Sequence, residues 1–111
     1  MIEKTSYEIS VLPGDGIGPE LTEEVIKVLN TAQQIFIGFS LNYTYFEAGA
    51  GLYLRTGEVF PREEYDAIVK SDVIYKGPVG LPEAILPDGT EAGVTDVILR
   101  SSLDLWANVR P

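Results

Sequence analysis

Two arginines in the last part of the sequence have the chemistry to bind a carboxylate ligand. Arg100 lies in a segment with helical spacing, VTDVILRSSLDLW, and Arg110 follows ten positions later, in NVRP. A guanidinium group binds a carboxylate through two parallel hydrogen bonds and keeps its charge at physiological pH. If the chain turns back between the two residues, both groups converge on one anionic ligand. The alternative is that each is a surface arginine paired with Asp104 or with a glutamate.

A lysine and a glycine-proline loop follow the short apolar segment DVIYK. Lys76 ends this segment, and GPVG occupies positions 77–80. Open α/β sheets bind their ligands at the carboxyl ends of the strands, which makes Lys76 a candidate substrate-binding residue. Backbone amides in a loop of this composition can approach a ligand closely. The alternative for Lys76 is a solvated lysine at the end of a strand.

The glycine-rich stretch LPGDGIGPE is typical of loops that bind a nucleotide phosphate, but the spacing of its glycines does not match the known motifs. Gly14, Gly16 and Gly18 follow a strand-like run, yet the dinucleotide fingerprint G-x-G-x-x-G requires its third glycine where Pro19 stands. The Gly-Lys-Ser/Thr ending of a P-loop is also absent from the stretch. The alternative is a tight turn that leads into a helix, with Asp15 as the cap of that helix.

Composition and charge exclude several classes of function. The 111 residues fit one domain, and 17 acidic against 8 basic residues give a formal net charge of −9, which argues against a nucleic-acid partner. With no cysteine and no histidine, disulfides, thiolate sites and imidazole catalysis are excluded. The charged start lacks the apolar run of a signal peptide, and no stretch has the ~18 apolar residues of a membrane span. We therefore expect a cytoplasmic protein with no membrane partner.

The hydrophobic pattern alternates between strands and helices. It predicts strands over residues 7–12, 41–47 and 72–76, and helices over residues 19–34, 61–72 and 94–106. Residues 48–60 are expected to form a loop with little regular structure, residues 77–93 an extended loop, and residues 107–109 the start of a strand. This order predicts an α/β fold with a parallel sheet. Because NVRP ends without a cap or closing element, we expect an incomplete chain.

Three motifs in one order resemble those of a known enzyme family. LPGDGIGPE near the start, KGPVG at 76–80 and LRSSLDLWANVRP at the end are similar to the motifs of the β-decarboxylating dehydrogenases, which act on isopropylmalate, isocitrate, homoisocitrate or tartrate. The resemblance covers the whole chain, although the enzymes of the family are considerably longer. It implies the N-terminal part of an isopropylmalate dehydrogenase-like fold rather than a Rossmann fold.

The resemblance also implies a reaction and its cofactors. A 2-hydroxy acid is oxidised, with hydride transfer to NAD or NADP, and then loses a carboxylate with the help of Mg²⁺ or Mn²⁺. Arg100 and Arg110 match the family's substrate-carboxylate ligands, and Gly77, Pro78, Val79 and Gly80 match the loop beside the nicotinamide. The family's metal ligands and its catalytic tyrosine and lysine follow the ANVRP motif, so we expect no catalytic or metal-binding residue in this chain and no activity from it alone.

The choice of substrate depends on the helical turn before Arg100. Isopropylmalate enzymes tend to place an apolar pair there, whereas isocitrate enzymes use Ser and Asn. Here the turn contains Gly93, Val94, Asp96 and Val97. Asp96 would repel an extra carboxylate and Val97 is apolar, which favours 3-isopropylmalate, the substrate of an enzyme of leucine biosynthesis. Lys76 favours isocitrate, because isocitrate dehydrogenases share KGP, so isocitrate and tartrate-like substrates stay open.

The family also sets expectations for the whole protein. Residues 1–111 would form the N-terminal portion of the large dehydrogenase domain and enter the second domain at about 100–111. A di- or tricarboxylate substrate and a homodimer are expected for the complete protein. The other class of function is a noncatalytic regulatory or binding subunit of the same fold, in which the two arginines bind a regulatory carboxylate or are structural.

Overall fold

Three parallel strands form the centre of the molecule. The computed structural model describes residues 3–92 and 95–111. The strands β1 (Ser6–Leu12), β2 (Ser40–Tyr45) and β3 (Val73–Lys76) make one sheet in the order β2-β1-β3. The pairing is parallel throughout; Ile9 lies opposite Tyr43 on one side and Val73 on the other. The expected α/β fold with a parallel sheet is therefore confirmed.

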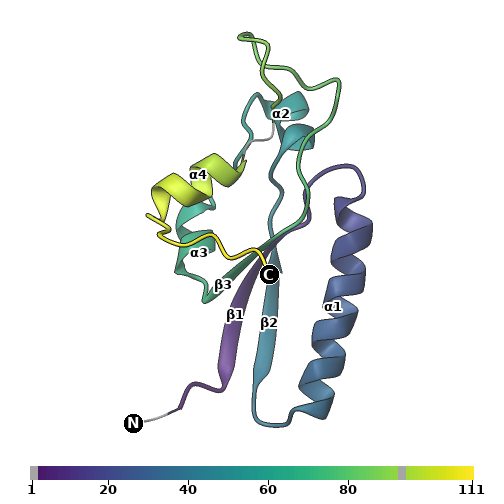
Figure 1. Cartoon of the computed structure of the whole chain (residues 1–111), viewed down its shortest axis with the longest axis vertical. Coiled ribbons are helices and arrows are strands. Elements are labelled where there is room, and N and C mark those ends of the chain that lie inside the picture. The colour runs from purple at the N-terminus through teal and green to yellow at the C-terminus, as the bar shows by residue number, and fades with distance from the viewer. Residues whose placement is uncertain (1–2, 93–94) are drawn as a thin grey trace.

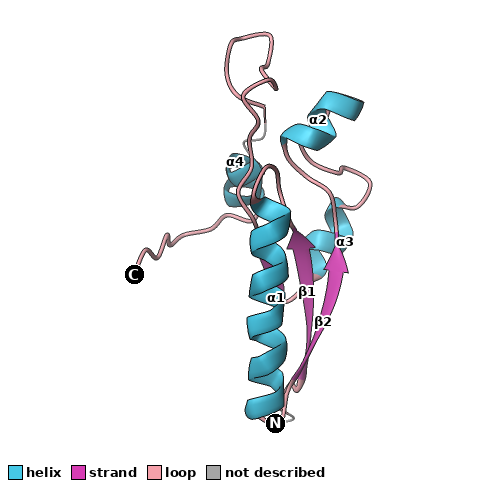
Figure 2. Ribbon diagram, turned by 90° about the vertical axis from the view of Figure 1, so that its right-hand side faces the viewer, coloured by secondary structure: helices cyan, strands magenta, loops and turns pink. Residues whose placement is uncertain are grey.

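Helices cover both faces of this sheet. Helix α1 (Gly18–Ile35) runs along one face, and α3 (Tyr65–Lys70) and α4 (Thr95–Ser102) lie on the other, as Figures 1 and 2 show. Helix α2 (Ala50–Thr56) lies beyond the carboxyl ends of the strands (Figure 1). The loop after β3 rises past α2 and forms a small hairpin, in which Ile85 and Glu91 make an antiparallel bridge.

The main hydrophobic core lies between the sheet and the helices α3 and α4. It contains Leu12, Ala48, Phe60, Ile68 and Leu99, all buried. Phe60 also packs edge-on against the ring of Tyr65, with 5.9 Å between the ring centres. A second cluster joins α2 to the hairpin through three buried alanines, Ala50, Ala84 and Ala92. The small side chains allow the two backbones to approach closely.

Several predicted elements differ from those in the structure. Residues 48–60 do not form an irregular loop, because α2 occupies 50–56. The predicted helix over 61–72 begins only at Tyr65, after a turn, and ends at Lys70 because Ser71 has an extended backbone. Residues 107–109 form no strand. The other strands and α1 lie within two residues of their predicted bounds.

Helix α4 ends earlier than the periodicity predicted, at Ser102 instead of Trp106. Asp104 takes a left-handed conformation, with φ of 49°, which aspartate tolerates better than most residues. The amide of Asp104 donates to the carbonyl of Ser101 (3.4 Å), and the amide of Leu105 donates to that of Arg100 (3.2 Å). This is the Schellman pattern of helix ends. It turns the chain away from the helix axis before Trp106.

Candidate functional site

Two loops at the carboxyl edge of the sheet, those after β1 and β3, pack backbone against backbone. A Cβ atom on Gly14 would lie 2.0 Å from the carbonyl oxygen of Pro78, and one on Gly77 would lie 2.0 Å from that of Pro13. Neither position can carry a side chain without moving a backbone. These two glycines therefore serve contacts within the chain, and Gly18 is similarly close to Pro13, with a Cβ at 2.2 Å from its carbonyl oxygen.

Asp15 does not cap α1, in contrast to the sequence-based alternative. The residue before α1 is Ile17, and no side chain hydrogen bonds to that end of the helix. The Asp15 carboxylate instead accepts hydrogen bonds from the amides of Ala50 (2.7 Å) and Gly51 (2.8 Å), at the start of α2. The sequence signal for this contact is weak: a short helical run after Gly49 with no Ser, Thr, Asp or Asn of its own before it.

Lys76 lies at the carboxyl end of β3, as predicted. The residue is half-buried, and its ammonium group donates to the carbonyl oxygen of Gly77 at 2.9 Å. The charge therefore lies against the start of the loop 77–80, at the edge where open α/β sheets bind ligands. A role in substrate binding stays a prediction.

The loop 77–80 uses part of its own polar backbone inside the chain. The amide of Gly77 donates to the carbonyl of Leu12 (2.8 Å), and that of Gly80 donates to the Asp15 carboxylate (2.8 Å). Gly77 is buried, Pro78 is exposed, and Val79 is half-buried. A cofactor at this loop would therefore meet Pro78 and Val79 rather than the amides of the two glycines. The cofactor role of the loop stays a prediction.

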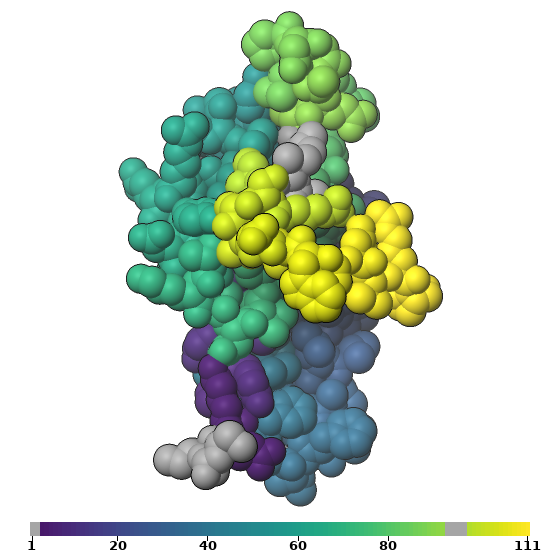
Figure 3. Space-filling view, turned by 60° about the vertical axis from the view of Figure 1, so that its left-hand side comes forward, coloured from purple at the N-terminus to yellow at the C-terminus, as the bar shows by residue number. Residues whose placement is uncertain are grey.

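Arg100 lines a cavity at the end of α4. This cavity has a volume of about 330 Å³, and its other walls come from residues 105–109, including Trp106 and Asn108. Arg100 is exposed in the last turn of the helix, where a positive charge complements the helix dipole. Trp106 is 96% exposed beside it. The last residues of the chain (yellow in Figure 3) stand out from the body of the molecule.

The structure does not bring all the predicted substrate-binding residues together. Arg110 is exposed and is not among the residues that line the cavity beside Arg100. The side chains of Asp96 and Val97 lie outside the described part of the chain, as do Gly93 and Val94 altogether. The hypothesis that this turn selects the substrate is therefore untested.

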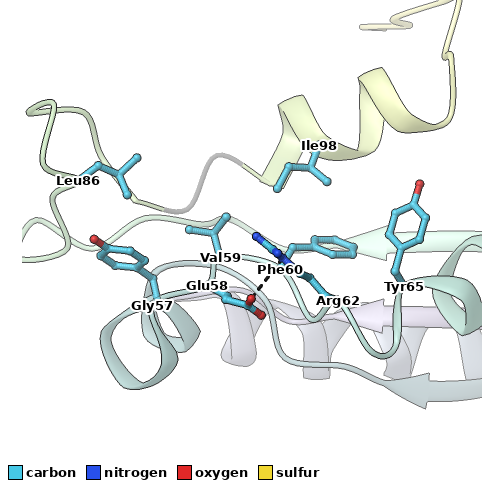
Figure 4. Close-up of a pocket in the computed structure, with 9 residues that line it drawn as sticks. Gly57, Glu58, Val59, Phe60, Arg62, Tyr65, Leu86 and Ile98 are labelled. Atoms are coloured by element: carbon cyan, nitrogen blue, oxygen red, sulfur yellow. Dashed lines mark ion pairs between the residues drawn. The ribbon is translucent and has the colours of Figure 1, made fainter.

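A larger hollow lies between Ile98 of α4 and the segment 57–62. Its volume is about 480 Å³, and its walls are mainly apolar, with Tyr53, Val59 and Ile98 among them. Figure 4 shows Ile98 pointing from α4 toward Val59 and Phe60, and an ion pair of 3.2 Å between Arg62 and Glu58 on the opposite wall. None of the predicted site residues lines this hollow.

Neither a cluster of metal-ligating side chains nor a membrane-spanning helix is found among the described residues. Within 3–92 and 95–111, no group of three or more His, Cys, Asp or Glu side chains is placed to hold a metal ion. Among the helices of those same residues, none combines the length and the apolar character needed to cross a membrane.

Comparison with known proteins gives the same family as the motifs. The model of the family "Isocitrate/isopropylmalate dehydrogenase" matches residues 8–111, nearly the whole chain. The chain belongs to this dehydrogenase family. It is 39% identical to a 3-isopropylmalate dehydrogenase of Symbiobacterium thermophilum, over 96% of this chain and 29% of that protein. It is 31% identical to a probable tartrate dehydrogenase/decarboxylase of Bacillus subtilis, over 95% of this chain and 29% of that protein.

A solved structure supports membership of the dehydrogenase family. The apo form of a β-decarboxylating dehydrogenase from Thermococcus kodakarensis matches with a TM-score of 0.69 and 28% sequence identity, over 88% of this chain and 27% of that one. The chain thus spans about three tenths of the length of the curated relatives that it matches. The parallel sheet with its flanking helices is the dehydrogenase-like fold that the three motifs implied.

Proposed function

We propose that this chain supplies the N-terminal part of a β-decarboxylating dehydrogenase that oxidises 3-isopropylmalate, as in leucine biosynthesis, with NAD or NADP and with Mg²⁺ or Mn²⁺. The observation that carries the proposal is the 39% identity to a 3-isopropylmalate dehydrogenase over 96% of the chain. In the whole protein, residues 1–111 belong to the large domain and about 100–111 enter the second. The complete protein is a cytoplasmic homodimer.

In this proposal the residues of the chain position the substrate. Arg100, exposed at the end of α4, and Arg110, exposed in the segment that follows, hold the carboxylates of the substrate. In a chain with a net charge of −9, such groups provide the local positive field that an anionic ligand needs. Lys76 and the turn that contains Asp96 and Val97 form the rest of the substrate-binding site. The loop 77–80 would hold the nicotinamide end of the cofactor, which would supply the acceptor for the hydride removed from the substrate.

A chimera tests the proposal directly. This chain replaces the matching segment of the Symbiobacterium thermophilum 3-isopropylmalate dehydrogenase, which supplies the remaining length. Reduction of NAD and NADP is then followed with 3-isopropylmalate, isocitrate and tartrate, with either metal. We expect a preference for 3-isopropylmalate, and a drop in kcat/KM of about 10- to 100-fold in Arg100→Gln and in Arg110→Gln, the range for a lost charged hydrogen bond.

The matched control is Arg62→Gln, which removes an exposed arginine that pairs with Glu58. We expect this variant to keep the activity of the chimera. A chimera that folds, as judged by circular dichroism, but prefers isocitrate or tartrate would contradict the choice of substrate. A folded chimera without activity on any of the three would contradict the dehydrogenase proposal.

The chain by itself offers a second candidate function, that of a noncatalytic carboxylate-binding subunit. The observation that favours it is the cavity at Arg100. Trp106 is the only tryptophan and lines this cavity, so its fluorescence reports binding. For this function we expect a dicarboxylate to quench the fluorescence saturably, and we expect the quenching to disappear in Arg100→Gln. The 111-residue chain should not reduce NAD.

A further inference from the structure

A single carboxylate connects all three loops at the carboxyl edge of the sheet. Asp15 belongs to the loop after β1, and its side chain accepts hydrogen bonds from the start of α2 after β2, at Ala50 (2.7 Å) and Gly51 (2.8 Å). It also accepts a hydrogen bond of 2.8 Å from the amide of Gly80, in the loop after β3. Asp15 is 9% exposed, so these contacts are largely shielded from water. Hydrogen bonds to a charged acceptor are about twice as strong as neutral ones.

The surroundings of Asp15 are shaped for this carboxylate. Gly49 has φ of 110°, and a Cβ there would lie 2.5 Å from Oδ2 of Asp15. A Cβ on Gly51 would lie 3.2 Å from Oδ1. Because these two glycines have no side chain, the carboxylate has space to reach the amides of α2. The backbone amide of Asp15 also donates to the carbonyl oxygen of Pro78 at 2.8 Å.

The loop 77–80 is consequently held at both ends. Its first amide, at Gly77, donates to Leu12, and its last, at Gly80, donates to Asp15. Gly80 has φ of 122°, a conformation that is accessible mainly to glycine. A loop that is ordered in advance loses less conformational entropy when a ligand binds.

We infer that Asp15 is a positioning residue, which holds the loop 77–80 in the conformation that receives the nicotinamide end of the cofactor. The inference rests on the proposed function for the identity of the ligand, but the contacts are those of the chain itself. The described hydrogen bonds of the Asp15 carboxylate all come from backbone amides of the protein, so the carboxylate acts on the ligand through the loop rather than by touching it.

Amide hydrogen exchange of the chain tests the first half of this inference. In Asp15→Asn the side-chain NH₂ faces at least one of the three donors, so we expect the amides of Gly51 or Gly80, or both, to exchange at least about 10-fold faster, the effect of a lost charged hydrogen bond. The matched control is Asp88→Asn, the same change at a carboxylate that accepts from the amide of Thr90 at 3.0 Å. It should leave the amides of Gly51 and Gly80 protected.

A measurement on the unmodified chain covers the case in which Asp15→Asn does not fold. Scalar coupling across the hydrogen bond, between the amide nitrogen of Gly80 and the carboxyl carbon of Asp15, is expected in NMR spectra. If this coupling is absent and the amide of Gly80 exchanges at the rate of an unprotected amide, the inference is overturned. The same holds if Asp15→Asn folds and leaves the protection of Gly51 and Gly80 unchanged.

Kinetics of the chimera test the second half. With Asp15→Asn we expect KM for the nicotinamide cofactor to rise about 10-fold, the effect of one lost charged hydrogen bond, and KM for 3-isopropylmalate to stay within about 2-fold. Arg100→Gln should give the opposite split. An active chimera in which Asp15→Asn changes neither KM, or both equally, overturns the positioning role. A folded but inactive chimera with Asp15 intact contradicts the proposed function instead, and the exchange experiment then decides on Asp15 alone.

Discussion

The helices α1 and α2 owe their structure to different sources. Helix α1 has 18 residues, with Pro19 in its first turn and Glu20 near its positive end, so the signals for its start lie in its own sequence. Helix α2 has only 7 residues and no side-chain cap from its own N-terminal residue, and the acceptor for its first amides is Asp15, 35 positions before Ala50. Its start is therefore made by a tertiary contact.

The difference shows where local sequence stops being informative. Helices shorter than about 12–15 residues are marginal in water by themselves, so α2 needs support from the rest of the fold. That support comes from Asp15 at one end, Gly57 in the left-handed conformation at the other, and the packing of Ala50 on Ala84 and Ala92. We therefore expect α2 to be lost selectively when these contacts are removed, while α1 persists.

The largest effect is expected where the loops that carry Asp15 and Gly80 meet. Gly77→Ala places a Cβ 2.0 Å from the carbonyl oxygen of Pro13 and forces two backbones apart, so we expect a loss of at least ~3 kcal/mol in the free energy of unfolding. Gly16→Ala is the control, because it meets nothing within 4 Å and carries only the strain of φ at 58°. It should cost about 1 kcal/mol in the same urea denaturation.

The second effect concerns the carboxylate itself. Asp15→Ala leaves three backbone amides without their acceptor, and we expect a loss of about 2–4 kcal/mol. Backbone ¹³C chemical shifts should lose their helical values over 50–56 and keep them over 18–35. Gln33→Ala is the comparison, since Oε1 of Gln33 accepts one amide, that of Leu41, at 2.8 Å, and its loss should cost about 1 kcal/mol. Equal melting of both helices in Asp15→Ala would argue against a selective role.

A smaller effect is expected at the end of α2. Gly57 has φ of 81° and donates its amide to the carbonyl of Tyr53 at 2.7 Å. Gly57→Ala introduces left-handed strain without a clash, and should cost about 1 kcal/mol. Gly38→Ala, with φ of 120° and likewise nothing within 4 Å, adds strain beyond the end of α1. Both should lower the urea midpoint, but only Gly57→Ala should increase amide exchange within α2.

The smallest effect is a pH dependence that lies away from both helices. A side-chain hydrogen bond from Lys4 and a backbone hydrogen bond from Glu8 lower the pKa of Asp72, at the start of β3. Its contribution to stability is therefore present above the unfolded pKa, near 3.8, and is lost as the pH falls through the lower folded value. The urea midpoints of the unmodified chain and Asp72→Asn should differ at pH ~7 and converge in acid below the folded pKa. A difference that persists in acid would show another cause.

Much of the fold was predictable because most elements carry their own pattern. The alternation in β1 and the apolar period of α1 predicted these elements within two residues. The apolar period did not predict which face would be covered: Leu21 and Val28 of α1 are exposed, whereas Thr22 is 2% exposed and donates its hydroxyl to the carbonyl of Gly18. Helical spacing identifies a helix, but its neighbours decide which side is buried.

The candidate site was predicted by residue type better than by arrangement. Lys76 lies at a strand end, as the pattern predicted, whereas Arg100, predicted for the middle of a longer helix, lies in the last turn of α4. The predicted convergence of Arg110 with Arg100 depended on a strand, expected over 107–109, and these residues form no strand. In addition, α4 ends early, at Asp104 and Leu105. A helix end of this kind depends on a left-handed residue other than glycine, for which the sequence has no strong signal.

By itself, then, the sequence determined the family, the parallel α/β order and the types of side chain available for a carboxylate ligand. These follow from motifs, periodicity and composition, which are local or additive properties. Only the tertiary structure decided that the glycines of the loop after β1 let the backbone of the loop after β3 pack closely against them. It also decided that Asp15 caps α2 rather than α1. The physical reason is that a backbone amide needs an acceptor but does not specify from where in the chain it comes. Folding brought Asp15 to Ala50, Gly51 and Gly80, and periodicity carries no information about such a contact.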